Sequence, residues 1–550
     1  MKKICLFFFC TVAGSMLYGQ TPAWLWAVAP SGLYESDGWD ITTDSAGNSY
    51  VIGGFIGPAT FGSFTLTGFG GEDIFIVKYN ASGSVIWAHQ AGGNGYDNGN
   101  GICLDNNGNI YVTGFYQGSA TFGSTLLPSS GGNDMFVAKY DTAGDFIWVK
   151  HPTGTSGEYG RKIFADASAN LYVTGSFNGT SSFDSYMITS NGTQDIFIAK
   201  YDTSGNVVWV RNGGDQTNQD FSFGITADNS GNCYITGCFY FTAQFGSLSV
   251  TSIGNSDIFI AKYDPAGNIS WLEKAGGSAG NDAGNAISAD GYASIYLTGV
   301  FYSMAYFDGD TLISAGSADV FTAKYDTAGH VIWARNGGGT NEDSGHDLAL
   351  DRNGHLYIAG NFDGTASFGS SMINSFGGAG LFTVKYDTSG NVIWAQQASG
   401  GSGSTIFCNG ISSDWAGSIY TTGQHYYPVS FGSYNLNGSN TPYMFIAKLD
   451  TLSVVTWNNE SQLVGTGMIP FPNPMSASTV ISFSLLHAER ACIKIFDQNG
   501  RLVSVLADRI FTAGENKLIW SAGDIKSGLY FLQLEAESGI ENRKLMVIKQ

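Results

Sequence analysis

Carboxylates that recur in glycine-rich segments are the residues of this 550-residue chain best placed for chemistry. Most of them follow a Gly-Gly pair by a few residues, as Asp97 follows Gly92 and Gly93. A loop carboxylate of this kind could hold a cation or a basic group of a ligand. An ordinary solvated loop acid explains the same spacing, so the sequence leaves a Ca²⁺ site open without requiring any cofactor. The candidate ligand-binding series is Asp97, Glu158, Asp220, Asp282 and Asp343, with Asp37 one position out of step and Ile406 in the seventh place.

A second acidic series begins short turns. In one copy, Asp105, Asn107 and Asn109 alternate as the ligands of cation-binding loops do. Gly108 favours a tight hairpin instead, because an Asp side chain accepts hydrogen bonds from nearby backbone N–H groups and Gly adopts positive φ. We therefore expect hairpins that begin at Asp44, Asp105, Asp166, Asp228, Asp290, Asp351 and Asp414.

Established catalytic motifs do not occur in the sequence. There is no phosphate-binding loop or Cys/His nucleophile, and the seven histidines form no short metal-binding pair. The Gly-x-Ser-x-Gly string at residues 276–280 is not followed by a helical pattern, so it is no nucleophile elbow. Trp39 and Trp415 stand apart from the regularly spaced tryptophans and either stack on a sugar or fill the core. Seven lysines recur at one place, but a catalytic residue needs one special environment, so we interpret them as structural partners of a repeated aspartate. The lysines are Lys78, Lys139, Lys200, Lys262, Lys324, Lys385 and Lys448.

Composition narrows the class of protein. The chain has 76 glycines, 14% aromatic residues and 13% charged residues. Disordered chains are poor in aromatics and coiled coils need charged heptads, so both classes are excluded. Many short strands joined by tight turns are expected instead. A net charge of −20 repels phosphate groups, which argues against a nucleic-acid partner.

Tryptophan, tyrosine and lysine recur with a period of about 61 residues. Each copy carries four strand signals and no helical periodicity. A four-stranded sheet cannot bury both of its apolar faces alone, and radial repetition lets each sheet cover its neighbour. We therefore predict an all-β chain with a seven-bladed β-propeller over residues 21–457. Eight tryptophans mark only seven copies, which leaves open the strand that closes the ring. They are Trp26, Trp87, Trp148, Trp209, Trp271, Trp333, Trp394 and Trp457.

Connections between successive antiparallel strands alternate between the two faces of such a propeller. The tight Asp hairpins join strands one to two and three to four, so they share one face, the hairpin face. The longer, glycine-rich connections share the other, the long-connection face. Loops on a rigid scaffold commonly carry binding residues, so we expect any ligand to contact the long-connection face.

The segment from Asp195 to Trp209 reads Asp-Ile-Phe-Ile-Ala-Lys-Tyr-Asp-x-x-Gly-Asn-x-x-Trp and resembles the secreted-bacterial β-propeller repeat called SBBP. The seventh copy departs from the pattern, because Tyr443, Leu449 and His425 replace the usual Asp, Tyr and Phe. The resemblance implies a propeller but no single activity, since a fold does not fix a function.

The N-terminal end carries an export signal. Lys2 and Lys3 precede an apolar run that is too short to span a bilayer, and Gly19 followed by Gln20 offers a cleavage point. This pattern predicts a signal peptide over residues 1–19. No later stretch reaches membrane-spanning length, so we expect no transmembrane segment.

The C-terminal end forms a second domain. After a linker over residues 458–469, period-two alternation across residues 470–550 predicts a small Ig-like antiparallel β-sandwich. This segment resembles the type A C-terminal sorting domain of type IX secretion cargo. The resemblance implies the type IX machinery as a partner, and a secreted protein or one on the outer-membrane exterior of a Gram-negative bacterium. The matching positions include Asn473, Pro474, Gly500, Gly514, Gly528 and Tyr530.

Together these features indicate an exported, non-catalytic binding or adhesion protein with a glycan or protein ligand. The alternative is an extracellular hydrolase or lyase that degrades polysaccharide. Unrepeated carboxylates near the propeller axis would favour the enzyme, and the sequence shows no convincing set.

Overall fold

The computed structural model describes residues 22–450 other than 33, 34, 156, 291–293, 376, 415 and 416, and residues 469–547 other than 472, 474, 476, 477, 486, 498–501, 522, 524, 537 and 538. Their regular structure consists of β-strands, which confirms the all-β class. The chain divides into two compact units, Met1–Val454 and Val455–Gln550. The predicted signal peptide, its cleavage point at Gly19 and Gln20, and nearly all of the predicted linker lie outside the described residues.

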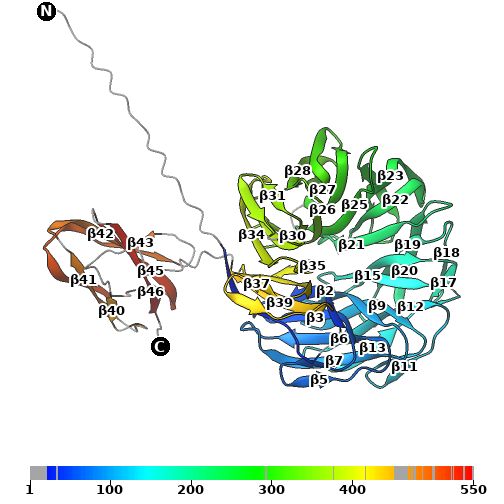
Figure 1. Ribbon diagram of the computed structural model, residues 1–550, viewed down its shortest axis with the longest axis horizontal. Helices are drawn as coiled ribbons and strands as arrows, with labels where there is room; N and C mark the ends of the chain where they lie inside the picture. The colour runs from blue at the N-terminus through cyan, green and yellow to red at the C-terminus, as the bar shows by residue number, and fades with distance from the viewer. Residues whose placement is uncertain are drawn as a thin grey trace, which may run out of the picture. The chain divides into compact units, whose positions relative to one another are not determined.

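In the first unit, the pairing of the described strands forms four-stranded antiparallel blades arranged around an axis (Figure 1). Each blade is listed from its innermost strand outward. Blade one contains β2 (Glu35–Thr43), β3 (Ser49–Ile56), β6 (Glu72–Tyr79) and β7 (Val85–Gly93), and blade two contains β8 (Asn98–Leu104), β9 (Ile110–Gln117), β12 (Asn133–Tyr140) and β13 (Phe146–Lys150). Blade three contains β15 (Glu158–Ala165), β16 (Leu171–Phe177), β19 (Asp195–Tyr201) and β20 (Val207–Gly214), and blade four contains β21 (Phe221–Ala227), β22 (Cys233–Phe245), β23 (Leu248–Tyr263) and β24 (Ile269–Ala275).

Blades five to seven follow the same plan. Blade five contains β25 (Ala283–Ala289), β26 (Ser294–Phe307), β27 (Asp310–Asp326) and β28 (Val331–Gly339). Blade six contains β29 (Ser344–Leu350), β30 (Leu356–Phe362), β33 (Gly380–Tyr386) and β34 (Val392–Gly400). Blade seven contains β35 (Thr405–Ser413), β36 (Ile419–Tyr426), β39 (Tyr443–Asp450) and β1 (Ala23–Val28).

The ring is closed by the strand nearest the N-terminus. Each innermost strand packs against the next one, and β35 packs against β2. Strand β1 pairs with β39, so that Ala23 lies opposite Asp450 and Val28 opposite Ile446. The strand of Trp26 is therefore the outermost strand of the seventh blade, whereas Trp457 lies outside the described residues.

Short hairpins in the connection between the second and third strands tie neighbouring blades together. Strand β10 (Ala120–Phe122) of the second blade pairs with β7 of the first, and β37 (Val429–Phe431) of the seventh pairs with β34 of the sixth. Such pairing covers the outer edges of the blades, which would otherwise expose unpaired backbone groups. The remaining short strands are β4 (Ala59–Phe61), β5 (Phe64–Leu66), β11 (Thr125–Leu127), β14 (Thr153–Gly154), β17 (Thr180–Phe183), β18 (Tyr186–Thr189), β31 (Thr365–Phe368), β32 (Ser371–Asn374) and β38 (Tyr434–Leu436).

The regularly spaced tryptophans pack between blades. Trp209 is 3% exposed, its Nε1 donates to the Pro265 carbonyl of the next blade at 3.1 Å, and its ring stacks on Tyr263. Burial and a partner for the indole N–H are what a core tryptophan needs. Trp87, Trp333 and Trp394 are also buried, while Trp26, Trp148 and Trp271 are half-buried.

The repeated lysines are structural, but their main partner is a tyrosine ring rather than the predicted aspartate. The Lys200 ammonium lies 4.9 Å from the centroid of Tyr172, whose hydroxyl donates to Asp166. The seven lysine-to-ring distances lie between 4.7 and 5.3 Å, which is cation–π range. Among the described residues, a lysine of this series also comes within 4 Å of a hairpin carboxylate at Lys385 and at Lys448.

The acidic turns are hairpins, as expected. Asp105 Oδ1 accepts from the backbone N–H groups of Asn107 at 2.8 Å and Asn109 at 2.9 Å, and Oδ2 accepts from the Tyr111 hydroxyl at 3.1 Å. Gly108 has a φ of 80°, which a residue with a side chain rarely adopts. Both oxygens of the Asp105 carboxylate are therefore engaged by the turn itself.

The second unit is an antiparallel β-sandwich. One sheet contains β40 (Ile469–Phe471), β41 (Ser478–Leu485) and β44 (Gly514–Ser521), and the other contains β43 (Leu502–Phe511), β42 (Glu489–Asp497), β45 (Gly528–Ala536) and β46 (Gly539–Val547). Inward-facing residues of both sheets, such as Phe483 and Leu532, form a single core.

The sorting-motif positions fall in different environments. Tyr530 is buried against Trp520, and its hydroxyl donates to the Lys526 carbonyl at 2.9 Å. Gly514 has a φ of 91°, where glycine is favoured. Asn473 and Gly528 are exposed. Pro474 and Gly500 lie outside the described residues.

Candidate functional site

One position in each innermost strand carries a bulged, unrepeated residue. The register between β2 and β3 shifts from Gly38 to Asp40, which leaves Trp39 without a partner across the ladder, and the six other blades shift at the equivalent place. A bulge turns its side chain away from the alternating faces of the strand. The seven bulged residues are Trp39, Asn100, Arg161, Phe223, Asn285, His346 and Asn409.

These side chains surround the mouth of the central channel. A cavity of about 260 Å³ is lined by all seven of them together with Lys162 and Ser344. All seven are half-buried, so they combine fixed positions with access from outside. The innermost strands begin at the long-connection face, and the cavity shares Ser344 and His346 with a groove lined by residues 341–343 of a connection between blades, so we place the mouth on that face.

A buried ion triad forms the floor of the mouth. The Lys162 ammonium contacts Asp40 Oδ1 at 2.8 Å and Asp347 Oδ2 at 3.3 Å, so that blades one, three and six meet on the axis. Burial alone would lower the pKa of Lys162, but the two carboxylates raise the pKa above its ordinary value and keep the amine charged. The other blades carry only Gly101, Gly224, Ala286 or Gly410 at this position, which leaves room for the triad.

Backbone groups complete the coordination of the two carboxylates. Asp40 Oδ2 accepts from the Ile102 N–H at 2.9 Å, and Asp347 Oδ2 accepts from the Ile411 N–H at 3.2 Å. Lys162 also borders a second cavity, of about 220 Å³, which lies toward the hairpin face. The triad therefore separates two cavities along the axis.

Several donors at the mouth are unused within the described chain. Trp39 Nε1 and Arg161 Nε are buried without a hydrogen-bond acceptor. The Arg161 guanidinium lies over the Tyr159 ring at 5.8 Å, and burial lowers the pKa of this arginine. Burial lowers the pKa of His346 to about 4, so its imidazole is neutral at pH 7.

The three asparagines at the mouth link adjacent blades. Asn100 Nδ2 donates to the Gly160 carbonyl at 2.8 Å, and the same contact runs from Asn285 to Gly345 at 2.8 Å and from Asn409 to Gly38 at 2.9 Å. Each amide nitrogen is held in this way, which fixes the side chain with its oxygen as an acceptor for a ligand.

A groove continues the mouth outward. A cavity of about 710 Å³ over blades five to seven shares Ser344 and His346 with the axial cavity. Tyr302 and Phe407 supply aromatic surface, and Glu342 and Asp363 supply exposed carboxylates. The mouth and groove together could take a chain-like ligand with one end on the axis.

The five acids of the candidate ligand-binding series are buried, so the alternative interpretation as ordinary solvated loop carboxylates is wrong. Asp97 is 0% exposed; its Oδ2 accepts from Gly93 N at 2.6 Å and its Oδ1 from Gln117 N at 2.8 Å. The carboxylate thus fastens the inter-blade connection to the end of the second strand. Asp220, Asp282 and Asp343 make the same pair of contacts, and Glu158 accepts from the Ser181 hydroxyl.

These acids support the long-connection face rather than the mouth. Of the five, Asp343 lines the groove described above, and none lines the axial cavity. Among the described residues, no group of three or more His, Cys, Asp or Glu side chains is arranged to hold a metal ion. Trp415, the second isolated tryptophan, lies outside the described residues.

The sequence contains a signal for the mouth that motif reasoning missed. Each bulged residue stands five positions before the Asp that begins the following hairpin, as Trp39 precedes Asp44. Aligning the copies on that Asp reveals a column without a repeated consensus, surrounded by repeated residues. Trp39 and His346 attract attention singly, but only the column shows that they share a ring.

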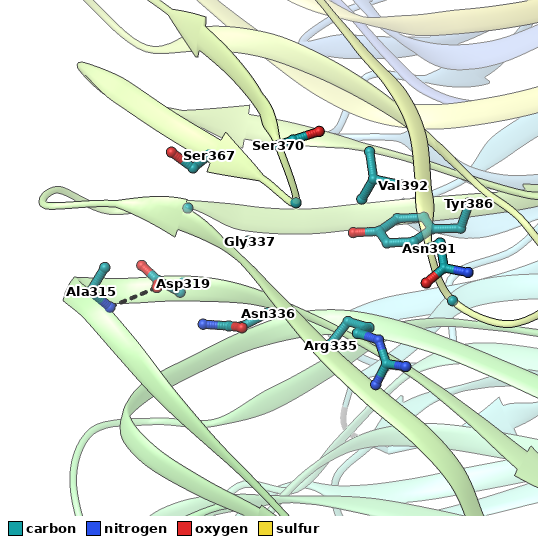
Figure 2. Close-up of a pocket in the computed structure, with 13 residues that line it drawn as sticks. Ala315, Asp319, Arg335, Asn336, Gly337, Ser367, Ser370, Tyr386, Asn391 and Val392 are labelled. Carbon is teal, nitrogen blue, oxygen red and sulfur yellow. Dashed lines mark hydrogen bonds between the residues drawn. The ribbon is translucent and has the colours of Figure 1, made fainter. Parts of the chain in front are cut away.

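Larger pockets on the outer rim repeat between blades. Figure 2 shows one, of about 590 Å³, which Arg335 and Asn336 of the fifth blade line together with Tyr386 of the sixth. The third and fourth blades form a counterpart of about 520 Å³ with Arg211. Arg211 Nε donates to the Gly267 carbonyl at 2.7 Å, so this arginine already serves the contact between blades.

Two family matches define what the chain contains. Residues 470–549 match the Secretion system C-terminal sorting domain, and residues 86–114 match the SBBP β-propeller repeat. The chain therefore contains a β-propeller repeat and a C-terminal sorting domain. In particular, it carries the sorting domain of type IX secretion and is a secreted or cell-surface protein of a Bacteroidetes-type Gram-negative bacterium. Both resemblances noted in the sequence are confirmed.

Two curated relatives share part of the chain. An uncharacterized WD repeat-containing protein of Acanthamoeba polyphaga mimivirus is 25% identical, over 68% of this chain and 34% of the relative. The regulatory protein FlaEY of Caulobacter vibrioides is 27% identical, over 29% of this chain and 19% of the relative. This chain thus spans about a third of the first relative and about a fifth of the second.

Solved structures show only a distant likeness. A mutant of the Synechocystis apocarotenoid oxygenase has a TM-score of 0.34 and 10% identity, covering 69% of this chain and 94% of the oxygenase. PorZ, a surface component of the type-IX secretion system of Porphyromonas gingivalis, has a TM-score of 0.17 and 11% identity, covering 95% of this chain and all of PorZ. Scores of this size carry no inference about the site. No helix long and apolar enough to cross a membrane occurs among the described residues.

Proposed function

We propose that this protein is an exported, non-catalytic binding protein whose ligand enters the mouth of the propeller channel on the long-connection face. The observation that carries the proposal is the ring of bulged residues. The blades repeat Trp, Tyr, Lys and Asp, yet residues as different as Trp39, Arg161 and His346 occupy one equivalent position around the axis. The residues that maintain the fold repeat in the blades, whereas the residue at the bulged position differs between blades, as a site for a single ligand requires.

The chemistry of the mouth supports binding rather than hydrolysis. Glycosidases need two carboxyl groups free to exchange protons with the substrate. Asp40 and Asp347 are unrepeated carboxylates near the axis, which alone would favour the enzyme, but both are held by Lys162 and by backbone N–H groups beneath the mouth. Removing either from this network would leave buried charge uncompensated.

The lining favours a glycan as the ligand. Trp39 and Phe223 offer apolar ring surface, and the asparagine amides offer fixed hydrogen-bonding groups at the same level of the channel. Sugars present apolar faces edged by hydroxyl groups, and such a mixture of aromatic and amide groups complements both. The C-terminal domain accounts for export in this proposal, because its sorting signal directs the propeller to the type IX machinery and so to the cell exterior.

A glycan and protein array probed with the secreted form tests the proposal. We expect binding to a restricted set of glycans that is lost in Trp39→Ala and Phe223→Ala. Tyr96→Ala is the matched control, because Tyr96 is an exposed aromatic outside the axial cavity, 53% accessible, and its loss should leave binding unchanged. Binding that survives both mouth variants, or release of sugar products from a bound polysaccharide, would contradict the proposal.

A further inference from the structure

We propose that Arg161 binds the carboxylate of one acidic sugar residue at the end of an otherwise neutral glycan. This inference rests on the proposed function, since it assigns the ligand class of the same mouth. Arg161 comes from the innermost strand of the third blade, at its bulge, and lines the axial cavity beside Lys162.

Arg161 is a cation without a counter-ion in the described chain. Its neighbour Lys162 is neutralised by Asp40 and Asp347, whereas Arg161 makes no ion pair with a described carboxylate and has only the Tyr159 ring against it. Its buried Nε has no acceptor. An arginine in a closed setting ordinarily satisfies its planar set of five N–H donors, and a carboxylate matches two of them at once.

The surroundings of Arg161 fit the rest of a sugar. Trp39 presents a second buried donor without an acceptor, its Nε1. The rings of Phe221 and Phe223 stack with their centroids 5.9 Å apart and an interplanar angle of 13°, and Phe223 lines the cavity. The neutral His346 and the asparagine amides can exchange hydrogen bonds with hydroxyl groups. The charged N–H donors of Arg161 thus lie among groups that suit an uncharged sugar ring.

Size and charge limit the ligand to one acidic residue. The axial cavity of about 260 Å³ lies below the 300–1,000 Å³ that drug-sized ligands occupy, so it holds an end and not a long segment. The groove that continues from it exposes Glu342 and Asp363. A polyanionic chain would meet these carboxylates and a protein of net charge −20, whereas a neutral chain with one terminal acid would not.

The test compares two sugars that differ only at the carboxyl group. The probes are an oligosaccharide with a single terminal glucuronic acid on a neutral chain and its carboxyl-reduced form, titrated by calorimetry against the full propeller. We expect the acid to bind the wild type at least about tenfold more tightly, as a charge-assisted hydrogen-bonded pair predicts. Arg161→Gln should remove this difference, and Arg161→Lys should retain part of it because Lys keeps the charge but not the fork.

The outcomes separate this inference from the proposed function. Equal affinity of the wild type for the two sugars, with binding still lost in Trp39→Ala, would overturn the role of Arg161 and leave the mouth as the binding site. Peptides that bind through a free C-terminal carboxylate but not as amides, with neither sugar bound, would overturn the glycan assignment in favour of a protein partner. The sugar comparison on the wild type needs no variant, so it decides the question even if Arg161→Gln fails to fold.

Discussion

Asp73 and Asp97 each place one carboxylate oxygen against the α-carbon of Gly92. A β-carbon at Gly92 would lie 2.4 Å from Asp73 Oδ1 and 2.8 Å from Asp97 Oδ2, and Gly92 has a φ of 138°. Only glycine leaves room for the two acids to approach in this way. Asp73 is the second residue of the third strand of one blade and Asp97 precedes the first strand of the next, so the pair marks a junction between blades.

The two acids occur together around the ring. Asp195 with Asp220, Asp257 with Asp282 and Asp319 with Asp343 repeat the arrangement at Gly214, Gly276 and Gly338. At the junction of blades six and seven both are replaced, by Gly380 and Ile406. Asp73 Oδ1, Asp257 Oδ1 and Asp319 Oδ1 are buried without a hydrogen-bond partner. We interpret each pair as two carboxyl groups that repel each other when both are ionised, which favours a proton on one of them.

The pairs predict that the propeller loses stability as the pH rises from about 4 to about 7. Burial, with a smaller contribution from the facing carboxylate, raises the pKa of Asp97 to about 6 and of Asp282 and Asp343 to about 7. An unfolded Asp titrates near 3.9, so the folded state binds more protons in this window and its stability falls as they leave. Urea unfolding at pH 5 and at pH 8 measures the effect.

Asp73→Asn tests this repulsion directly. Asp73 Oδ2 accepts from the Phe69 N–H, which the side-chain oxygen of Asn could also do, while the neutral amide removes the negative charge that faces Asp97. We expect the variant to gain on the order of 1 kcal/mol at pH 8 relative to the wild type and less at pH 5. Asp145→Asn, at an exposed carboxylate, is the control. Stabilisation by Ca²⁺ that disappears in Asp73→Asn would show instead that a cation joins the pair.

The fold could be predicted because its structural residues recur in each copy, whereas the site could not be predicted because its residues differ between copies. The blades and the hairpins follow from residues such as Trp209 and Asp105, which serve the same purpose in each copy and therefore recur at a fixed spacing. The mouth consists of residues that share a position, but apart from three asparagines they differ in chemistry, so no motif describes it. The burial of Asp97 could not be predicted either, because it depends on the backbone of Gly92 folding the connection back over the carboxylate.

Removing the Lys162 amine should destabilise the propeller strongly. In Lys162→Met, Asp40 and Asp347 would face each other on the axis without their shared cation. Breaking a buried ion pair in this way costs about 3–5 kcal/mol, and the partial access of Lys162, 24% exposed, places the expectation near the lower end, about 3 kcal/mol. Asp40→Asn and Asp347→Asn combined with Lys162→Met should recover part of the loss. A Lys162→Met protein as stable as the wild type in urea would contradict the structural role of the triad.

Truncating a tryptophan between blades should lower stability without changing ligand binding. Trp209→Ala removes a side chain that is 3% exposed, together with its hydrogen bond to Pro265, and should cost about 3–5 kcal/mol. Trp209 does not line the axial cavity, so the folded fraction should bind its glycan with unchanged affinity. Chemical unfolding and calorimetry on the same sample measure both quantities. Lost binding at unchanged stability would make the repeated tryptophans binding residues.

Deleting Phe471 to Gln550 should leave the propeller folded and keep it inside the cell envelope. The deletion removes the segment matched by the sorting domain, and the propeller belongs to the other compact unit, with hydrophobic cores between its own blades. Thermal unfolding of the purified propeller should therefore give the same midpoint with and without the C-terminal unit.

Fractionation of the producing bacterium should find the truncated form in the periplasm and the full chain on the surface or in the medium. Export of the truncated propeller in normal amount would show that the signal for routing lies elsewhere in the chain.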